Sequence, residues 1–569
     1  LGLLQSLTMS RSYDQRAETQ YFTDDGQMAK SAYAIERSTE SVQMGVNTSL
    51  SLRPSPGSRL SLRGLYTNKA DDEVLQYQGP DPNDGSFDRR AARLTYVQRA
   101  IGYLTAEGQH ELKGALPGTL DWKFTRSHAR RQTPDKRESM YIRIPVDATD
   151  PGTWGLATGR REYGDLNEDG WGTTAKLALP YRLGSLGSGR VVTGYDRQSR
   201  ERGTSYRRFD FVPVQFGSAA PPESIYRGSV NDATLARDNY VADQLIEAYF
   251  VSADLPLGKR LRANAGVRRE FGAQNVMSHD LYDPSFITSQ GQSRGTDLLA
   301  GANLTLAITE KLSLRAAASR TLNRPDMDDL SPLQSLDYVG DKIHSGNPLL
   351  TRALISNYDL RVESFPGVGE VFAAGVFYKQ LDHPIEPAVF GTNGQLGLQP
   401  QNSLGGRNVG VELEARAGLG RIAELLKPVS LNSNLSLISS RIRSQQTTDR
   451  GNGEHSLAGQ APYLLNVGLT WISPSGRSEF SLLTSSVGKR LKELYQTSDN
   501  GVANGRSNLE TAGITTLDAT ASLTPYRGAR LKIAAGNLLN RSVREMEGNL
   551  ELHRYSTGRT FSVSLSVGS

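Results

Sequence analysis

The amino-acid sequence predicts an all-β fold, namely a large antiparallel β-barrel that spans a membrane. Segments of about ten residues alternate apolar and polar side chains, which is typical of strands with one apolar face. Short stretches rich in Gly, Pro and Ser alternate along the chain with long polar stretches. The predicted barrel therefore has short turns at one end and long loops at the other. No stretch approaches the roughly 18 apolar residues of a membrane-spanning helix, but barrel strands do not need one.

The composition excludes several function classes. The 569 residues include no cysteine, which rules out disulfides, thiolate metal sites and thiol nucleophiles. The net charge of +5 is small for this length, and no basic block with interleaved aromatic residues indicates nucleic-acid binding. The chain starts at Leu1 without an initiator Met or a signal peptide, so we expect either processing or a fragment.

The run from Leu312 to Glu363 shows the unit that the chain repeats. Leu312 and Leu314 lie on one face of a predicted strand, while Ser313 and Arg315 lie on the other. A polar excursion of about thirty residues follows, and a second alternating segment ends the run. We therefore predict a strand, a long loop and a second strand.

Between these long loops, nine short turns can be counted, each of which joins two predicted strands. Eight of the nine turns contain Gly, Pro or Ser, and each of the nine lies between two alternating segments, which gives about eighteen strands. Leu1–Ser12 and Thr560–Val567 add two more, so the sequence predicts about twenty strands. The predicted turns are Pro54–Gly57, Gly114–Gly118, Arg182–Ser188, Pro256–Lys259, Ile308–Lys311, Phe365–Gly369, Gly418–Lys427, Ser473–Gly476 and Pro525–Gly528.

The two faces of these strands predict which side meets lipid. The row Tyr463, Leu465, Val467, Leu469 and Trp471 has an aromatic residue at each end, as lipid-facing rows do. The polar rows are expected to line a wide lumen. Long polar excursions at the opposite end from the short turns are predicted to be extracellular loops: 13–42, 70–100, 131–170, 202–241, 272–295, 323–352, 381–406, 441–460, 488–513 and 538–558.

An ordered set of short motifs resembles the β-barrel of TonB-dependent receptors over nearly the whole chain. The resemblance implies a barrel of 22 strands around an N-terminal plug, preceded by an energy-coupling box. The motifs are Gly266-Val-Arg-Arg-Glu270, Arg320-Thr-Leu-Asn-Arg-Pro325, Asp329-Leu-Ser-Pro332, Gly346-Asn-Pro-Leu349, Asn357-Tyr-Asp-Leu360, Phe377-Tyr-Lys379, Arg407-Asn-Val-Gly-Val-Glu412, Gly459-Gln-Ala-Pro-Tyr463, Gly536-Asn-Leu-Leu-Asn540 and Gly558-Arg-Thr-Phe561.

The chain departs from the family pattern at both ends. Neither plug nor coupling box is visible, so we expect residues 1–569 to be one barrel domain that lacks the plug and the first hairpin. Ser10–Tyr13 would then lie at the outer end of the third strand. The last residue is Ser569, whereas such barrels usually end on an aromatic residue.

The resemblance also implies a function. Members of the family are non-enzymatic receptors of the outer membrane, which take up ferric siderophores, haem, cobalamin or oligosaccharides. Their expected partners are the ligand, the TonB energy-coupling complex acting through the plug, outer-membrane lipid and lipopolysaccharide; no cofactor and no nucleic acid are expected. The alternatives are a passive porin-like channel and a soluble, secreted β-rich binding protein. Nothing in the sequence names the cargo or the substrate-binding residues.

A few motifs could carry chemistry of their own. Asp165–Gly170 resembles the start of a calcium loop, but its twelfth position is Lys176 instead of a bidentate Glu, which favours a plain polar stretch at the mouth of a loop. Arg324-Pro325 and Gly346-Asn347-Pro348 are predicted to shape the loop backbone. No G-x-S-x-G elbow occurs.

Charged and ionisable side chains give two further hypotheses. Five arginines are predicted to form a basic cluster at an outer strand end, which either attracts an anionic substrate or lipopolysaccharide phosphate, or is simply solvated: Arg197, Arg200, Arg202, Arg207 and Arg208. Seven histidines are scattered without metal-ligand spacing, and we expect solvated side chains, with a ferric or haem ligand in the loops as the alternative: His110, His128, His279, His344, His383, His455 and His553.

Overall fold

The computed structural model describes residues 1–567 except for a number of short segments. The excluded positions are 25, 27, 84, 115–116, 145, 147–149, 151, 213–228, 336–340, 393–394, 445–452, 496–505 and 527. Ala115, Leu116 and Arg527, within two of the predicted turns, lie outside the described residues, as does Ser569. No helix among the described residues is long and apolar enough to cross a membrane.

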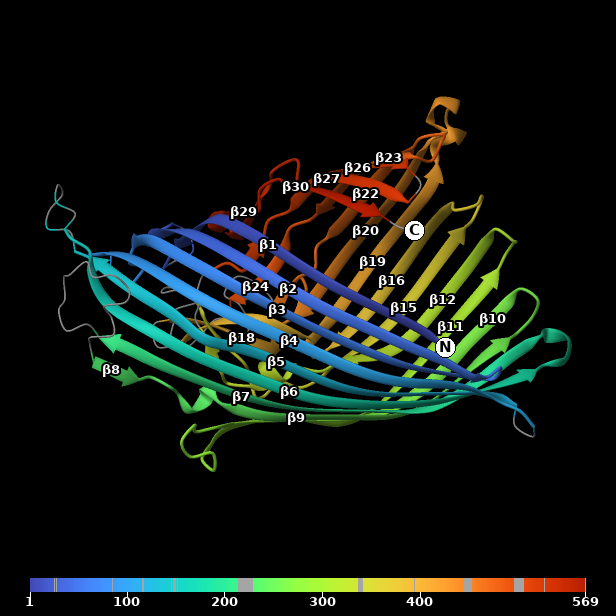
Figure 1. Cartoon of the computed structure of the whole chain (residues 1–569), viewed down its shortest axis with the longest axis horizontal. Helices are drawn as coiled ribbons and strands as arrows, with labels where there is room; N and C mark the ends of the chain where they lie inside the picture. The colour runs from blue at the N-terminus through green and yellow to red at the C-terminus, as the bar shows by residue number, and fades with distance from the viewer. Residues whose placement is uncertain are drawn as a thin grey trace.

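Twenty strands form one curved antiparallel wall in the described part of the chain, each hydrogen-bonded to its neighbours in sequence order (Figure 1). This confirms the predicted barrel and its count of about twenty strands. The wall strands are β1 (Gly2–Phe22), β2 (Ser31–Ser55), β3 (Ser58–Pro80), β4 (Asp88–Leu112), β5 (Gly118–Arg143), β6 (Gly155–Arg182), β7 (Ser188–Val212), β9 (Tyr240–Pro256), β10 (Leu261–His279), β11 (Ile287–Ala307), β12 (Leu312–Asn323), β15 (Ala353–Ser364), β16 (Val371–Asp382), β19 (Gly405–Gly418), β20 (Val429–Arg443), β22 (Tyr463–Ile472), β23 (Ser478–Val487), β26 (Ile514–Tyr526), β27 (Ala529–Gly536) and β30 (Thr560–Val567).

All nine predicted turns connect consecutive wall strands at one end of the barrel, which we call the turn end. Two of them carry short 3-10 helices: η1 (Gly184–Leu186) in one, and η4 (Leu419–Arg421) with η5 (Glu424–Leu426) in the other. The opposite end, which we call the loop end, carries the longer connections, so the predicted asymmetry is confirmed (Figure 1).

The strands of the first half are much longer than predicted. The first ten wall strands, β1 to β11, run for 17 to 28 residues, so most of the excursions 13–42, 70–100 and 131–170 are strand instead of loop. The backbone ladder continues there because polar pairs across the strands replace apolar alternation. One example is Asp71, which accepts hydrogen bonds from Ser41 on β2 and Arg99 on β4.

Among the described residues, β1 pairs with the C-terminal part of the chain only at the loop end, and not with the last wall strand. Glu18, Thr19 and Gln20 of β1 pair with β29 (Leu550–Ser556), and no described residue of β1 pairs with β30. Toward the turn end β1 and β30 are exposed along their lengths, and the two chain ends are separated in Figure 1. The wall therefore has two unpaired edges.

Short strands of the long connections build a second sheet across the loop end, which we call the mouth sheet. It runs through β13 (Gln334–Ser335), β14 (Ile343–Ser345), β18 (Gln395–Asn402), β17 (Ile385–Thr392), β24 (Arg490–Tyr495), β25 (Leu509–Thr511), β28 (Ser542–Glu547) and β29, and it joins the wall at β1. In Figure 1, β18 and β24 lie within the outline of the barrel. Val389, Tyr495, Leu509 and Leu552 form its buried core. The remaining short elements are β8 (Ser229–Asp232), β21 (Glu454–His455), η3 (Ala236–Asp238) and α1 (Met327–Leu330).

Candidate functional site

The connection between β12 and β15 is fastened to the wall at both ends by arginines that lie over glycines. Arg324 crosses Gly272 and pairs with Glu270 at 2.6 Å. Arg352 crosses Gly295 and donates two hydrogen bonds to Asp297, at 2.7 and 2.9 Å. A Cβ atom at either glycine would overlap the guanidinium group, so a larger residue there would force the arginine to shift.

Between these ends, α1 packs on the lumen face of the wall. Met327 and Leu330 are buried against Tyr240 and Val276. Asp328 accepts hydrogen bonds from the Tyr240 hydroxyl and, at 2.8 Å, from Arg202. The connection is thus held inside the barrel by both apolar and charged contacts.

Gly346-Asn347-Pro348 joins this connection to the mouth sheet. The backbone carbonyls of α1 and Ser331 pack so closely on Gly346 that no Cβ atom fits. The Asn347 side chain donates to the Pro400 carbonyl at 3.0 Å, and Gln399 donates to the Gly346 carbonyl at 2.7 Å. The prediction that this motif shapes the backbone is confirmed.

A cavity of about 720 Å³, which we call the upper cavity, lies between this connection and the wall strands β2 to β9. Its lining carries many charged side chains, of which six basic and four acidic ones face the lumen. These residues are Arg37, Arg93, Arg131, Lys136, Arg160, Arg208, Glu73, Glu162, Asp328 and Asp341, and His344 adds an imidazole.

Among the described residues, one basic side chain of the upper cavity lacks an acidic partner. Five of the six pair with carboxylates, for example Lys136 with Glu162 at 2.6 Å and Arg160 with Asp210 at 2.6 Å. Arg131 is exposed to the cavity and makes no ion pair within the described ranges. Its guanidinium is therefore available to an anionic group of a ligand.

Buried ion pairs hold the mouth sheet together above this cavity. Lys342 lies 2.6 Å from Glu493, and Arg506 pairs with Glu547, both with little exposure. The two cations face the ring of Tyr495, at 5.8 and 4.7 Å. Burial alone would lower the pKa of Lys342, but the neighbouring Tyr495 and Glu493 outweigh it and raise that pKa.

The contact between β1 and β29 contains a histidine between two carboxylates. His553 lies 3.1 Å from Glu18 and 3.8 Å from Glu545, and Lys492 pairs with Glu545 at 2.7 Å. Burial would lower the pKa of His553, but its hydrogen bonds to Glu18 and Glu545 raise the pKa to about 9. The imidazole is thus cationic at neutral pH.

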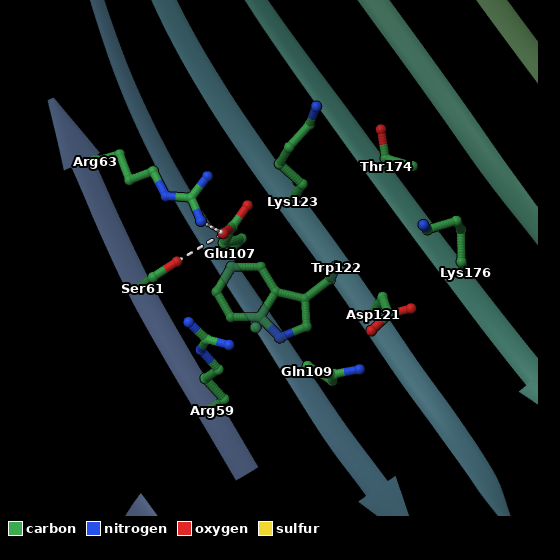
Figure 2. Close-up of a pocket in the computed structure, with 11 residues that line it drawn as sticks. Arg59, Ser61, Arg63, Glu107, Gln109, Asp121, Trp122, Lys123, Thr174 and Lys176 are labelled. Carbon is green, nitrogen blue, oxygen red and sulfur yellow. Dashed lines mark hydrogen bonds and ion pairs between the residues drawn. The ribbon is translucent and has the colours of Figure 1, made fainter. Parts of the chain in front are cut away.

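A second hollow, of about 390 Å³, lies on the lumen face of β3 to β6 near the turn end; we call it the lower cradle (Figure 2). Its lining side chains come from β3, β4, β5 and β6, and Figure 2 draws them as sticks. The lining residues are Arg59, Ser61, Arg63, Glu107, Gly108, Gln109, Asp121, Trp122, Lys123, Thr174 and Lys176.

The predicted arginine cluster is divided by strand alternation. Arg200, Arg202 and Arg208 face the lumen, whereas Arg197 and Arg207 point to the outer face of β7. The single cluster that the sequence predicted was therefore wrong, because all five residues lie on one extended strand.

Asp165–Gly170 lies in the middle of β6 and not in a loop, so neither a calcium loop nor a polar loop stretch is present. Asp165 accepts hydrogen bonds from Arg130 and Gln132, and Asp169 accepts one from Arg126. An extended backbone turns successive side chains to opposite faces, which is incompatible with ligands converging on one ion.

The seven histidines lie apart from one another. Besides His344 and His553, His455 is buried beside Glu386 at 3.0 Å, where Glu386 also accepts from Ser403 at 2.7 Å. The others contact nearby groups of the wall or its connections: His110 with Trp122, His128 with Asp169, His279 with the Asp280 carbonyl and His383 with Asp382. Among the described residues, no three His, Asp or Glu side chains could together hold a metal ion.

Sequence reasoning missed most residues of the upper cavity. Arg93, Arg131 and Arg160 lie in segments that were predicted to be loops, where no face can be assigned. A β-bulge between Thr133 and Lys136 also reverses the alternation, so that Lys136 joins Arg131 on the lumen face. If the alternation of inward and outward side chains had been continued along unusually long strands, these residues could have been assigned to the lumen face.

Comparison with solved structures shows the same fold at low sequence identity. The ferric-catecholate import receptor Fiu from E. coli K12 is 12% identical, with a TM-score of 0.61 over 97% of this chain and 81% of that one. The ferric yersiniabactin uptake receptor FyuA from Yersinia pestis is 13% identical, with a TM-score of 0.53 over 98% and 80%. The copper transporter OprC is 12% identical, with a TM-score of 0.57 over 98% and 80%.

A search of curated protein sequences finds no match. The family model described as "TonB dependent receptor-like, beta-barrel" matches residues 12–538, which is most of the chain. This family and the structural neighbours are receptors and transporters, not enzymes, and barrels of the family lie in the outer membrane of Gram-negative bacteria. The chain therefore belongs to the TonB-dependent receptor-like β-barrel family.

Proposed function

We propose that this barrel imports a scarce, negatively charged metal complex of the siderophore type across the outer membrane. The observation that carries the proposal is the upper cavity, where Arg131 offers an uncompensated guanidinium beneath the mouth sheet. An anionic complex can accept hydrogen bonds from this group, which a neutral oligosaccharide satisfies less well. Three solved neighbours are described as receptors or transporters of ferric catecholates, ferric yersiniabactin and ferric citrate.

We further propose that energy reaches this site from the inner membrane through a plug in the lumen, and that two more strands complete the wall. The unpaired edges of β1 and β30 support the proposal of two more strands. Because β1 and β30 run antiparallel to each other, an antiparallel wall can be closed between them only by an even number of added strands. Lipid and lipopolysaccharide would surround the outer face, where Arg126 and Arg130 stand beside acidic partners.

Binding of ferric citrate and of a ferric catecholate to the purified protein, followed by tryptophan fluorescence, tests the ligand class. We expect saturable binding of at least one complex, and about tenfold weaker binding in Arg131→Ala, since one charge-assisted hydrogen bond is lost. Arg126→Ala is the matched control, because Arg126 lies on the same strand but faces outward. Equal affinity in both variants would contradict the proposal.

The passive porin-like channel is the competing function. Uptake of radioactive iron by cells that produce the receptor separates the two, because energised uptake stops when the inner-membrane proton gradient is dissipated. Uptake that continues unchanged without the gradient would favour the passive channel.

A further inference from the structure

Three arginines lie in one row on the wall strands β12 to β20. Cross-strand pairing places Arg320, Arg407 and Arg441 in this row, with Ser356 and Gln380 between the first two. The strands that carry the row, β12, β15, β16, β19 and β20, are direct neighbours in the wall (Figure 1). All three arginines are exposed, and none forms an ion pair in the part of the chain that the structure describes. We call this set the arginine row.

The arginine row faces away from the lumen. Gly301 lies on the same face of β11 as Gly295, which Arg352 crosses from the lumen side, and Gly301 pairs with Ser319. Arg320 is the next residue after Ser319 and therefore points outward, as do the residues aligned with it. A plug in the lumen cannot cover an outward row. Strands added between β1 and β30 would not cover it either, since β22, β23, β26 and β27 separate β20 from β30.

The arginine row borders the apolar part of the outer face on its loop side. The next outward row toward the turn end contains Tyr358 and Tyr378, whose rings lie 6.3 Å apart. On β16, Phe372 marks the turn end of the same apolar stripe, so the stripe has an aromatic residue at each end. Such residues lie at the two membrane interfaces of a barrel. The arginines are therefore at the level of the lipid headgroups on the loop side.

The row beyond the arginines adds one charge of each sign. Arg443 is exposed and also forms no ion pair among the described residues. Asp382 lies on the same outward face and is 2.9 Å from His383. Four arginines and one aspartate give the two rows an excess of three positive charges. Unpaired cations that share a surface raise its local potential and attract anions.

Outward arginines on the long strands of the first half are different. Arg126 pairs with Asp169 at 2.7 Å, and Arg130 pairs with Asp165 at 2.8 Å. Their charges are compensated within the wall, whereas those of the arginine row are not. The excess of positive charge on the outer face of β12 to β20 is therefore a local feature.

We propose that the arginine row binds the phosphate groups of a glycolipid of the lipopolysaccharide type in the outer leaflet. A guanidinium donates two parallel hydrogen bonds to phosphate oxygens, and Ser356 and Gln380 supply neutral donors between the arginines. The acyl chains of the same molecule contact the tyrosine row and the apolar side chains below it. A lipid that carries phosphates next to its acyl chains thus satisfies both rows. This binding does not depend on which ligand the barrel imports.

Native mass spectrometry of the purified protein in detergent micelles, titrated with diphosphoryl lipid A, tests the proposal. We expect saturable binding that is about fivefold weaker in Arg407→Gln, because each basic residue near a charged membrane surface contributes about that factor. The triple variant Arg320→Gln, Arg407→Gln, Arg441→Gln should bind at least tenfold more weakly. The triple lysine variant at the same positions keeps the charges and should retain most of the binding.

Arg416→Gln is the matched control, because Arg416 is exposed on β19, faces the lumen and forms no ion pair within the described ranges. Lipid A without phosphates should bind at least tenfold more weakly, and equimolar inorganic phosphate should not compete. An unaffected triple glutamine variant, a loss in Arg416→Gln equal to that in Arg407→Gln, equal binding of lipid A without phosphates, or full competition by inorganic phosphate would overturn the proposal. The triple glutamine variant should bind the iron complex normally, whereas Arg131→Ala should bind lipid A normally, so the two proposals fail independently.

Discussion

Arg324 illustrates how single side chains position the connection that lines the upper cavity. Its guanidinium is 11% exposed and Glu270 is 9% exposed, so both charges are largely removed from water. Gly272 lets the arginine lie flat on the wall, and Gln274 holds the adjacent Pro325 carbonyl at 2.8 Å. A buried pair of this kind adds little net stability, but removing one partner leaves the other charge stranded.

Arg324→Ala is therefore expected to destabilise the protein by about 3 kcal/mol, at the lower end of the cost of breaking a buried pair because Glu270 keeps Arg268 as a second partner. Urea unfolding followed by circular dichroism measures this change. Arg320→Ala is the matched control, since Arg320 lies four residues earlier, is exposed on β12 and makes no ion pair among the residues described. Similar losses in both variants would show that the clamp contributes nothing specific.

At the residue scale, the sequence predicted which residues shape the backbone of the connection, but not which side chains bind one another. Gly346 and Pro348 indicated a shaped loop from their residue types alone, and close packing on Gly346 confirms it. The partner of Arg324 lies 54 residues away along the chain, on a strand two places removed in the wall. Only the three-dimensional register brings them together, which no local pattern encodes.

At the scale of elements, the short contact between β1 and β29 depends on the charge of His553. The imidazole stands between Glu18 and Glu545, while Arg37 pairs with Glu18 and Lys492 with Glu545. Both carboxylates face the imidazole directly, and they favour its protonated form. The ring of Tyr555 packs against it at 5.4 Å.

Raising the pH is expected to loosen this contact. The pKa of His553 is about 9 in the folded protein, against 6.5 as its ordinary value. The stabilisation is therefore complete below pH 6.5 and is lost as the pH rises through 9. Hydrogen exchange, corrected for the intrinsic pH dependence, should show faster opening of Glu18–Gln20 at pH 9.5 than at pH 6.

His553→Gln should abolish this pH dependence, because glutamine keeps a polar side chain but cannot become cationic. Opening rates that still rise between pH 6 and 9.5 in the variant would assign the effect to another group. The amides of β5 provide the internal reference, since that strand is paired on both sides.

Strand number was predictable from the sequence, whereas strand length was not. Nine turns each marked a strand pair, and eight of them contain Gly, Pro or Ser, because tight hairpins restrict residue type. The alternation of apolar and polar side chains stops partway along the strands β1 to β11, although their backbone hydrogen bonding continues. The mouth sheet was not predicted either, since its parallel pairs β14–β18 and β17–β24 join segments distant in sequence.

At the scale of the whole molecule, the unpaired edges of β1 and β30 determine whether the twenty strands form a closed barrel. The wall is joined through β1 and β29 at the loop end, whereas β1 and β30 carry unpaired edges toward the turn end. Leu3 and Val563 lie on the outer faces of these edges. Because the chain has no cysteine, pairs of introduced cysteines report on closure without interference.

Thr19→Cys with Arg554→Cys should form an intramolecular disulfide on mild oxidation, because directly paired residues place their Cβ atoms about 5 Å apart. Leu3→Cys with Val563→Cys should form none within one chain, and any cross-link should join two chains through their free edges. Non-reducing electrophoresis with mass spectrometry separates these products. An intramolecular Leu3–Val563 link that forms as fast as the first would mean that twenty strands close the wall by themselves, and would remove the support for two additional strands.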